Sequence, residues 1–253
     1  MQNQKTERNE IIDDGSSMEH WIVESSEPIF TSPWISVFRE TVKIPQKSIT
    51  INSATTGVDG EKQTAVTYKT MNPFYYVKEP DWVSIIALTP SNQIILVQQY
   101  RRGCNRVILE LPGGCIDEAD LPPSSSTSSE VLLNDNNKSN NVTVMDEIAQ
   151  RAGLRELEEE TGYCVDYSKP IVNLGTTLPD CSRTSSTAYG FLCHVTSEQP
   201  IKKQELDENE TIRVVSMSAS QVYQKFCIDR QEALSPVHTM FLFRAFVHLG
   251  QLP

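Results

Sequence analysis

The sequence predicts an α+β fold, and three observations support this prediction. Apolar, β-branched runs recur from His20 to Val77 and again from Val83 to Leu111, as in β-strands. A later stretch carries apolar residues at helical spacing and ends at Gly162, where glycine commonly terminates a helix. A final apolar helical pattern runs from Pro236 to Leu249.

Composition narrows the class of function. The formal net charge of −11 opposes binding to nucleic acid, and no run approaches the eighteen apolar residues of a membrane span. The polar residues 1–18 lack the apolar region of a secretory signal, so we expect a disordered tail. The six cysteines form no C-x-x-C pair, which favours reduced thiols in a cytoplasmic protein over a zinc site or disulfides.

Residues 19–80 are expected to form a small N-terminal antiparallel β region. Ile35–Ile44 and Thr64–Thr70 alternate or are β-branched, and Gly57–Gly60 marks a turn between them. About sixty residues make a thin core for an independent domain. We therefore expect this region to pack on the main domain or on a second subunit.

Residues 81–253 are expected to form the main domain. Two apolar runs, Val83–Leu88 and Ile94–Tyr100, predict a core hairpin. Residues 120–143 are rich in serine and asparagine and predict a disordered, low-complexity insertion. The remaining expected elements are strands at Val107–Leu111, Ile171–Leu174, Thr187–Val195 and Thr211–Ser216, a helix up to Thr161, and helices at Ser218–Phe226 and Pro236–Leu249.

The helix before Gly162 is the segment with the clearest chemistry. Residues three and four positions apart share a helix face, so Glu156, Glu159 and Glu160 are expected to point together. Their mutual repulsion becomes attraction around a hard divalent cation, of which Mg²⁺ is the usual choice and Mn²⁺ the second. The alternative is a solvated acidic face.

Further fixed positions surround these glutamates. Arg155 follows Glu147 by eight residues, Gly162 and Tyr163 follow Glu160, and Gly114 closes a Leu-Pro-Gly-Gly run upstream. Together they resemble the Nudix box, with one departure. The family has five residues between its glycine and first glutamate, whereas residues 115–146 number thirty-two here.

The resemblance implies an αβα sandwich with a mixed sheet, and it implies roles for the box residues. Glu156, Glu159 and Glu160 would be metal ligands, with the Gly113 carbonyl as a further oxygen donor. Glu147 and Arg155 would hold the helix against the preceding loop.

The flanking residues look most like those of the ADP-ribose and nucleotide-sugar diphosphatases. The markers are Gln-Gln-Tyr before Arg101, Leu-Pro-Gly-Gly after Glu110, and Pro179 beyond the box. The resemblance implies that Arg101 contacts the diphosphate of the substrate and that Glu110 lies near it. The alternative for Arg101 is a surface ion pair.

Two further roles follow from the same resemblance. A loop glutamate would act as base or additional metal ligand, and Glu210 fits best, with Glu208 second and a solvated charge run as the alternative. Trp34 is placed to stack on the base. The second stacking aromatic stays open between Tyr68 and Trp82, for both of which core packing is favoured.

The resemblance thus implies a Mg²⁺-dependent Nudix enzyme that cuts ADP-ribose or a related nucleoside diphosphate sugar into a nucleoside monophosphate and a sugar phosphate. The resemblance also implies a homodimer. The alternatives are hydrolysis of another nucleoside diphosphate derivative, such as a dinucleoside polyphosphate or a nucleoside triphosphate, and a non-catalytic module that binds a nucleotide or a partner.

Overall fold

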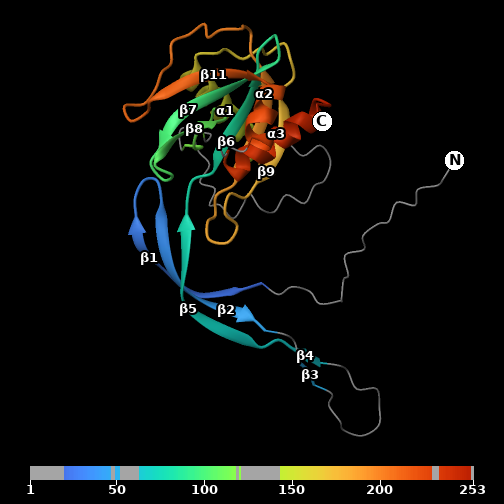
Figure 1. Cartoon of the computed structure of the whole chain (residues 1–253). Coiled ribbons are helices and arrows are strands. Elements are labelled where there is room, and N and C mark those ends of the chain that lie inside the picture. The colour runs from blue at the N-terminus through green and yellow to red at the C-terminus, as the bar shows by residue number, and fades with distance from the viewer. Residues whose placement is uncertain are drawn as a thin grey trace, which may run out of the picture. The chain divides into compact units, whose positions relative to one another are not determined.

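The computed structural model describes residues 20–46, 49–51, 63–117, 120, 143–229 and 234–251 (Figure 1). Contacts divide the chain into two compact units. One consists of Met1–Ser32 and Ser36–Tyr76, and the other of Pro33–Ile35 and Val77–Pro253. The expected tail, residues 1–18, the expected turn at Gly57–Gly60 and nearly all of the insertion at 120–143 lie outside the described residues.

The N-terminal unit is built from strands. β1 (Ile22–Thr31), β2 (Ser36–Pro45) and β5 (Tyr68–Lys78) form a sheet in the order β1-β2-β5, and β1 runs antiparallel to β2. β3 (Ile49–Ile51) and β4 (Gln63–Ala65) form a separate antiparallel pair. All of β1 is exposed, so this sheet buries little apolar surface of its own.

The main unit contains a mixed six-stranded sheet in the order β11-β7-β6-β10-β9, with β8 paired to β7. β10 runs parallel to β6, whereas the other pairs are antiparallel. The strands are β6 (Trp82–Leu88), β7 (Gln93–Arg101), β8 (Arg106–Glu110), β9 (Val172–Thr177), β10 (Ala188–His194) and β11 (Ile212–Ser218). The expected α+β fold with a mixed sheet is confirmed.

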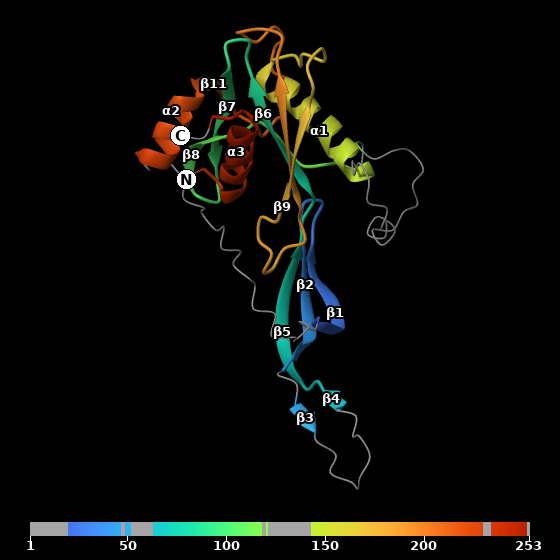
Figure 2. The same ribbon diagram turned by 90° about the vertical axis from the view of Figure 1, so that its right-hand side faces the viewer.

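Helices cover both faces of this sheet. Val83, Ile85 and Ala87 alternate along β6 with Ile86 and Leu88, and alternate residues of a strand point to opposite faces. The first set packs with α1 (Val144–Thr161) and the second with α3 (Pro236–His248). In Figure 2 the two helices flank the sheet on opposite sides, which is the expected sandwich.

Gly153 lets α1 lie close to β6. A Cβ atom at this position would stand 2.7 Å from side-chain atoms of both Val83 and Ile85. Glycine inside a helix costs about 1 kcal/mol relative to alanine. The close approach of helix and strand explains why this position carries no side chain.

The expected hairpin of β6 and β7 forms only beside its turn. β6 pairs with β7 at Ala87 and Leu88, and the far half of β7 pairs with β8 instead. Residues 112–114 lie along the free half of β6, where the Ile85 N–H donates to the Pro112 carbonyl (2.8 Å) and the Val83 N–H to the Gly114 carbonyl (2.9 Å). This fixes the Pro-Gly-Gly corner beside the first half of β6.

The C-terminal helices follow the sequence prediction with two differences. After α2 (Ala219–Tyr223) the chain continues as a π-helical turn at Gln224–Ile228. Met240, one of the apolar residues in the final helical pattern, is 42% exposed in α3. In the part of the chain that the structure describes, no helix combines the length and apolar character needed to cross a membrane.

Candidate functional site

α1 is capped at both ends, which fixes its acidic residues in space. The Thr143 hydroxyl accepts a hydrogen bond from the Asp146 N–H, and the Asp146 carboxylate accepts one from the Thr143 N–H. At the other end Gly162 adopts φ 70° and donates its N–H to the Glu158 carbonyl. The expected end of the helix at Gly162 is therefore confirmed.

The last two turns of α1 border a cavity of about 740 Å³ in the main unit. Arg155, Trp34 and the Gly113–Gly114 corner border it as well. Its acidic lining residues are Glu110, Asp117, Glu156, Glu159, Glu160, Glu205, Asp207 and Glu210. The three box glutamates thus share one hollow, together with acidic residues from two other segments.

Glu160 is the most deeply buried of these acids, with 3% of its surface exposed. Its Oε2 accepts a hydrogen bond from the Gly113 N–H at 2.9 Å. Burial raises the pKa of Glu160 to about 8; the Gly113 hydrogen bond lowers it, and the charges of Glu156 and Glu210 raise it further. The expected Gly113 contribution was its carbonyl, and the structure shows its N–H in use.

Glu156 lies against the same corner. A Cβ atom at position 114 would stand 2.6 Å from the Glu156 carboxyl carbon, so a larger residue there would displace this carboxylate from its present position. Burial raises the pKa of Glu156 to about 7, against the lowering effect of Arg155, and the charges of Glu159 and Glu210 add to the rise. Glu156 and Glu160 therefore ionise less readily than ordinary glutamates as long as no cation offsets their charge.

Arg155 joins three carboxylates. Its guanidinium lies 2.7 Å from Glu159 Oε2, 3.1 Å from Glu156 Oε1 and 3.4 Å from Asp120 Oδ2. Burial alone lowers the pKa of Arg155, but these neighbours together raise it above its ordinary value. Arg155 thus ties α1 to the segment that follows the glycine corner.

Glu147 and Arg155 were expected to hold the helix against the preceding loop, and in the structure Arg155 pairs with Asp120 of that loop. Glu147 lies in the first turn of α1 with an exposed side chain, and eight helical residues separate it from Arg155 by about 12 Å of rise. Asp120 has 10% of its side chain exposed and follows Gly114 after five residues. Asp120 therefore has the spacing from the glycine that the box motif requires, while Glu147 has the spacing from the arginine.

Asp120 is held in place by its neighbours. Its carboxylate accepts from the Asp117 N–H at 2.9 Å, and its carbonyl accepts from the Arg151 guanidinium at 3.1 Å. None of the sequence motifs above included Asp120. The five-residue spacer of the box, counted from Gly114 as residues 115–119, would have pointed to it.

Arg101 and Glu110 form an ion pair at 2.6 Å, and both line the cavity. Adjacent strands position them, since Arg101 ends β7 and Glu110 ends β8. The pair leaves 49% of the Arg101 side chain exposed, so part of its surface can meet a ligand. Both residues, which the sequence places near the substrate, line the cavity that also contains the box glutamates.

The aromatic part of the cavity contains Trp34, Trp82 and a buried histidine. Trp82 packs edge-to-face on His238 with ring centroids 5.8 Å apart. Burial lowers the pKa of His238 to about 4, and the Arg101 charge lowers it further, so the ring is neutral near pH 7. Nothing in the sequence pattern separates His238 from an ordinary helical histidine.

The acidic segment before β11 contributes unevenly to the site. Glu205, Asp207 and Glu210 line the cavity, whereas Glu208 does not. The order expected from the sequence, Glu210 before Glu208, agrees with this placement. Pro179 lies between β9 and β10 and is not among the residues that border the cavity.

Oxygen donors of this kind suit a hard cation. Carboxylates are the ligands that Mg²⁺ prefers, and a bound cation would favour the ionised forms of Glu156 and Glu160, which burial disfavours. Over the residues described, no three acidic, histidine or cysteine side chains already converge to enclose an ion. Arg155 engages two of the three box glutamates, so cation binding requires their side chains to turn toward the cavity.

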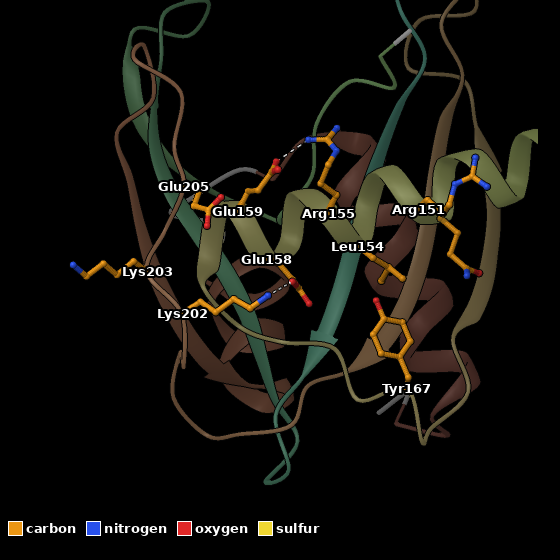
Figure 3. A pocket seen from close by; sticks show the side chains of 10 residues that line it. Arg151, Leu154, Arg155, Glu158, Glu159, Tyr167, Lys202, Lys203 and Glu205 are labelled. Atoms are coloured by element: carbon orange, nitrogen blue, oxygen red, sulfur yellow. Dashed lines mark hydrogen bonds and ion pairs between the residues drawn. The ribbon is translucent and has the colours of Figure 1, made fainter. Parts of the chain in front are cut away.

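A second, shallower hollow of about 440 Å³ follows the outer side of α1 (Figure 3). It shares Arg155, Glu159 and Glu205 with the acidic cavity. Figure 3 shows Lys202 reaching Glu158 and Glu205 lying beside Glu159. The segment around Lys202 therefore approaches the same end of α1 as the catalytic candidates.

Comparison with known proteins gives one family and several relatives. Residues 79–234 match the model of the NUDIX domain. The chain is 27% identical over 142 residues to an ADP-ribose pyrophosphatase of Bacillus subtilis (strain 168), covering 56% of this chain and 60% of that protein. It is 26% identical over 155 residues to a methanol dehydrogenase activator of Bacillus methanolicus, covering 58% of this chain and 63% of that protein.

A solved structure described as an ADP compounds hydrolase shares the fold. It superposes with a TM-score of 0.54 at 16% identity and covers 94% of this chain and 100% of its own. The two curated relatives match over about three-fifths of their own length.

Proposed function

The chain belongs to the Nudix family, and we propose that it hydrolyses the diphosphate bond of ADP-ribose or a related nucleoside diphosphate sugar. The products would be a nucleoside monophosphate and a sugar phosphate. The observation that carries the proposal is the gathering of Glu156, Glu159 and Glu160 in one cavity with Arg101. The similarity to an ADP-ribose pyrophosphatase supports the choice of substrate.

The main residues that line the cavity have proposed roles that follow from their positions. Glu156, Glu159 and Glu160 would hold divalent cations, Mg²⁺ first and Mn²⁺ second, and bound cations would neutralise the phosphate oxygens and activate the attacking water. Arg101, exposed on one side of its pair with Glu110, would contact the diphosphate. The acidic lining repels free anions, so phosphate binding depends on this arginine and on the cation.

The remaining lining residues would position the two ends of the substrate. Trp34 offers an aromatic surface on which a nucleobase could stack. Glu210 faces the box glutamates closely enough for its charge to raise the pKa of Glu156 and of Glu160. It is the preferred candidate for the base that takes the proton of the attacking water.

The test is release of a nucleoside monophosphate from a panel of substrates with and without Mg²⁺. The panel contains ADP-ribose, other nucleoside diphosphate sugars, a dinucleoside polyphosphate and a nucleoside triphosphate. We expect Mg²⁺-dependent release of AMP from ADP-ribose at the highest kcat/KM of the panel. If another compound of the panel is hydrolysed faster, that compound becomes the assigned substrate. If no compound is hydrolysed in a metal-dependent way, the protein is a non-catalytic binding module.

We also propose that the protein is a homodimer associated through its N-terminal unit. β1 exposes apolar side chains that a monomer would leave in water. These are Ile22, Val23, Ile29 and Phe30, each 46–54% exposed. Sedimentation of the wild type and of a Val23→Asp, Phe30→Asp variant tests this: we expect a dimer for the first and a monomer for the second.

The proposed compartment is the cytoplasm. In the part of the chain that the structure describes, the cysteines form no disulfide bond, as is usual in a reducing compartment. The free cysteines are Cys104, Cys115, Cys164, Cys181 and Cys193. Fractionation of cells that produce the tagged protein tests this location.

A further inference from the structure

The acidic loop, residues 206–210, approaches a region that repels it. Asp207 and Glu210 line the same cavity as Glu156, Glu159 and Glu160. The C-terminal end of α1 adds the partial negative charge of its unpaired carbonyl groups. Some part of the chain must therefore hold the loop in place while no cation does.

The segment Ile201–Glu205, here called the strap, supplies hydrogen-bond donors to this end of the helix. The N–H groups of Ile201 and Lys202 both donate to the Gly162 carbonyl at 3.0 Å. The Glu205 N–H donates to the Glu159 carbonyl at 2.9 Å. The strap thus caps carbonyl groups that the helix itself leaves unpaired.

Gln204 makes the contact that links three elements. Its side-chain amide donates to the Glu160 carbonyl at 2.5 Å and to the Ile212 carbonyl at 3.3 Å. Glu160 belongs to the metal-binding end of α1, and Ile212 begins β11 directly after the acidic loop. One neutral side chain therefore fixes both ends of the loop against the helix, without adding charge to the cavity.

Lys202 contributes to the strap in a different way. Its ammonium lies 2.6 Å from Glu158 Oε2, on the outer side of α1, as Figure 3 shows. The pair is exposed on both sides, at 53% and 28% of the side-chain surfaces, so solvent screens it. The strap is therefore held against α1 by the hydrogen bonds of its amide groups rather than by this ion pair.

We propose that Gln204 is a positioning residue that preorganises the acidic loop for divalent cations, so that cation affinity depends on it and affinity for the nucleotide does not. The inference rests on the proposed cation-dependent function. Without the amide, the loop would be free to move away from the like charges of α1. Binding a cation would then include the cost of bringing the loop back.

The test compares Mg²⁺ binding to the wild type and to Gln204→Met, which keeps the length of the side chain and removes both donors. Calorimetric titration with Mg²⁺ alone should show an affinity roughly threefold to tenfold lower in the variant, as expected for the loss of about one net hydrogen bond. At saturating Mg²⁺ the kcat and the KM for ADP-ribose should return to within about twofold of wild type. A purely structural role would not give this rescue by the cation.

Two matched variants control for general effects. Gln150→Met removes a half-buried amide from α1 outside the acidic cavity, and Lys202→Met removes the exposed ion pair of the strap itself. Both should bind Mg²⁺ within about twofold of the wild type. Equal Mg²⁺ affinity of wild type and Gln204→Met would overturn the inference, whereas a wild type that binds no Mg²⁺ would instead overturn the proposed function.

A measurement on the unmodified protein decides the matter if Gln204→Met does not fold. Hydrogen exchange of the Glu205 amide reports whether the strap is closed without a cation. We expect this amide to be protected at least about tenfold in the metal-free protein, with little change on adding Mg²⁺. An amide that exchanges freely until Mg²⁺ is added would refute preorganisation.

Discussion

The two ends of α1 both carry acidic residues, yet they differ in almost every physical respect. At the first turn Asp146 completes a capping box and Glu147 faces solvent. At the last two turns Glu156 is half-buried and Glu160 is buried, with pKa values raised to about 7 and about 8. Acidic residues favour the N-terminal end of a helix and are unfavourable at its C-terminal end.

The difference separates an end that stabilises the helix from an end where we propose that cations bind. Asp146 stabilises the helix because its carboxylate accepts a hydrogen bond from the Thr143 N–H in the capping box. Glu156 and Glu160 stand near like charges and a negative helix end, so they cost stability in the absence of a cation. Acidic side chains that lower the stability of the free protein are candidates for binding a ligand of opposite charge, here a cation.

The strongest test of this contrast is Glu160→Gln. Glutamine keeps the hydrogen bond from the Gly113 N–H but removes the negative charge, so we expect kcat to fall by about 10²–10⁴-fold. Glu158→Gln is the matched control, because Glu158 pairs with Lys202 outside the cavity. Steady-state kinetics should show less than about a twofold change for the control, and a similar loss in both variants would contradict the contrast.

The pH dependence of stability gives the next largest effect. The folded protein holds protons on Glu156 and Glu160 up to about pH 7 and about pH 8, whereas the unfolded chain releases them near pH 4.5. The stability that these groups contribute is therefore complete below about pH 4.5 and is lost as pH rises toward 8. Thermal unfolding of the metal-free protein should show a falling Tm across this window.

The same experiment has an internal control. Glu160→Gln removes the most strongly shifted group, so its Tm should change less between pH 5 and pH 8 than that of the wild type. Saturating Mg²⁺ should also flatten the wild-type profile. If the Tm of the variant and that of the wild type change equally with pH, burial does not disfavour the ionised form of Glu160.

Asp120→Asn is expected to have a smaller effect. Asparagine keeps an acceptor for the Asp117 N–H but loses the ion pair with Arg155, which is worth about 1 kcal/mol for a partly buried pair. We expect kcat/KM to fall roughly fivefold, because Arg155 also orients Glu156 and Glu159. An unchanged kcat/KM would remove Asp120 from the positioning of the site.

Local signals predicted much of this molecule. The strands from Val83 onward, the helix ending at Gly162 and the shared face of three glutamates follow from spacing and capping alone. Motif spacing also grouped Arg101 and Glu110 with the box glutamates, and all of them line one cavity. These features depend on residues that are close together in sequence.

Other features depend on how distant segments meet. The motif leaves two candidate acids, one at the correct distance from Gly114 and one at the correct distance from Arg155, and only the folded path of the chain distinguishes them. The division of β7 between β6 and β8 likewise follows from three-dimensional pairing. The burial of His238 beside Trp82 requires α3 to lie on β6, which no local pattern records.

The last test is Glu147→Gln, for which we expect the smallest effect. Glu147 lies about 12 Å along the helix axis from Arg155. Its exposed negative charge in the first turn interacts favourably with the helix dipole and stabilises α1 by about 0.3–1 kcal/mol. We expect a Tm lower by about a degree or two and a kcat/KM within about twofold of wild type. A tenfold loss of activity at unchanged Tm would instead return the box role to Glu147, and Asp120 would then be a neighbour of Arg155 without a part in positioning the site.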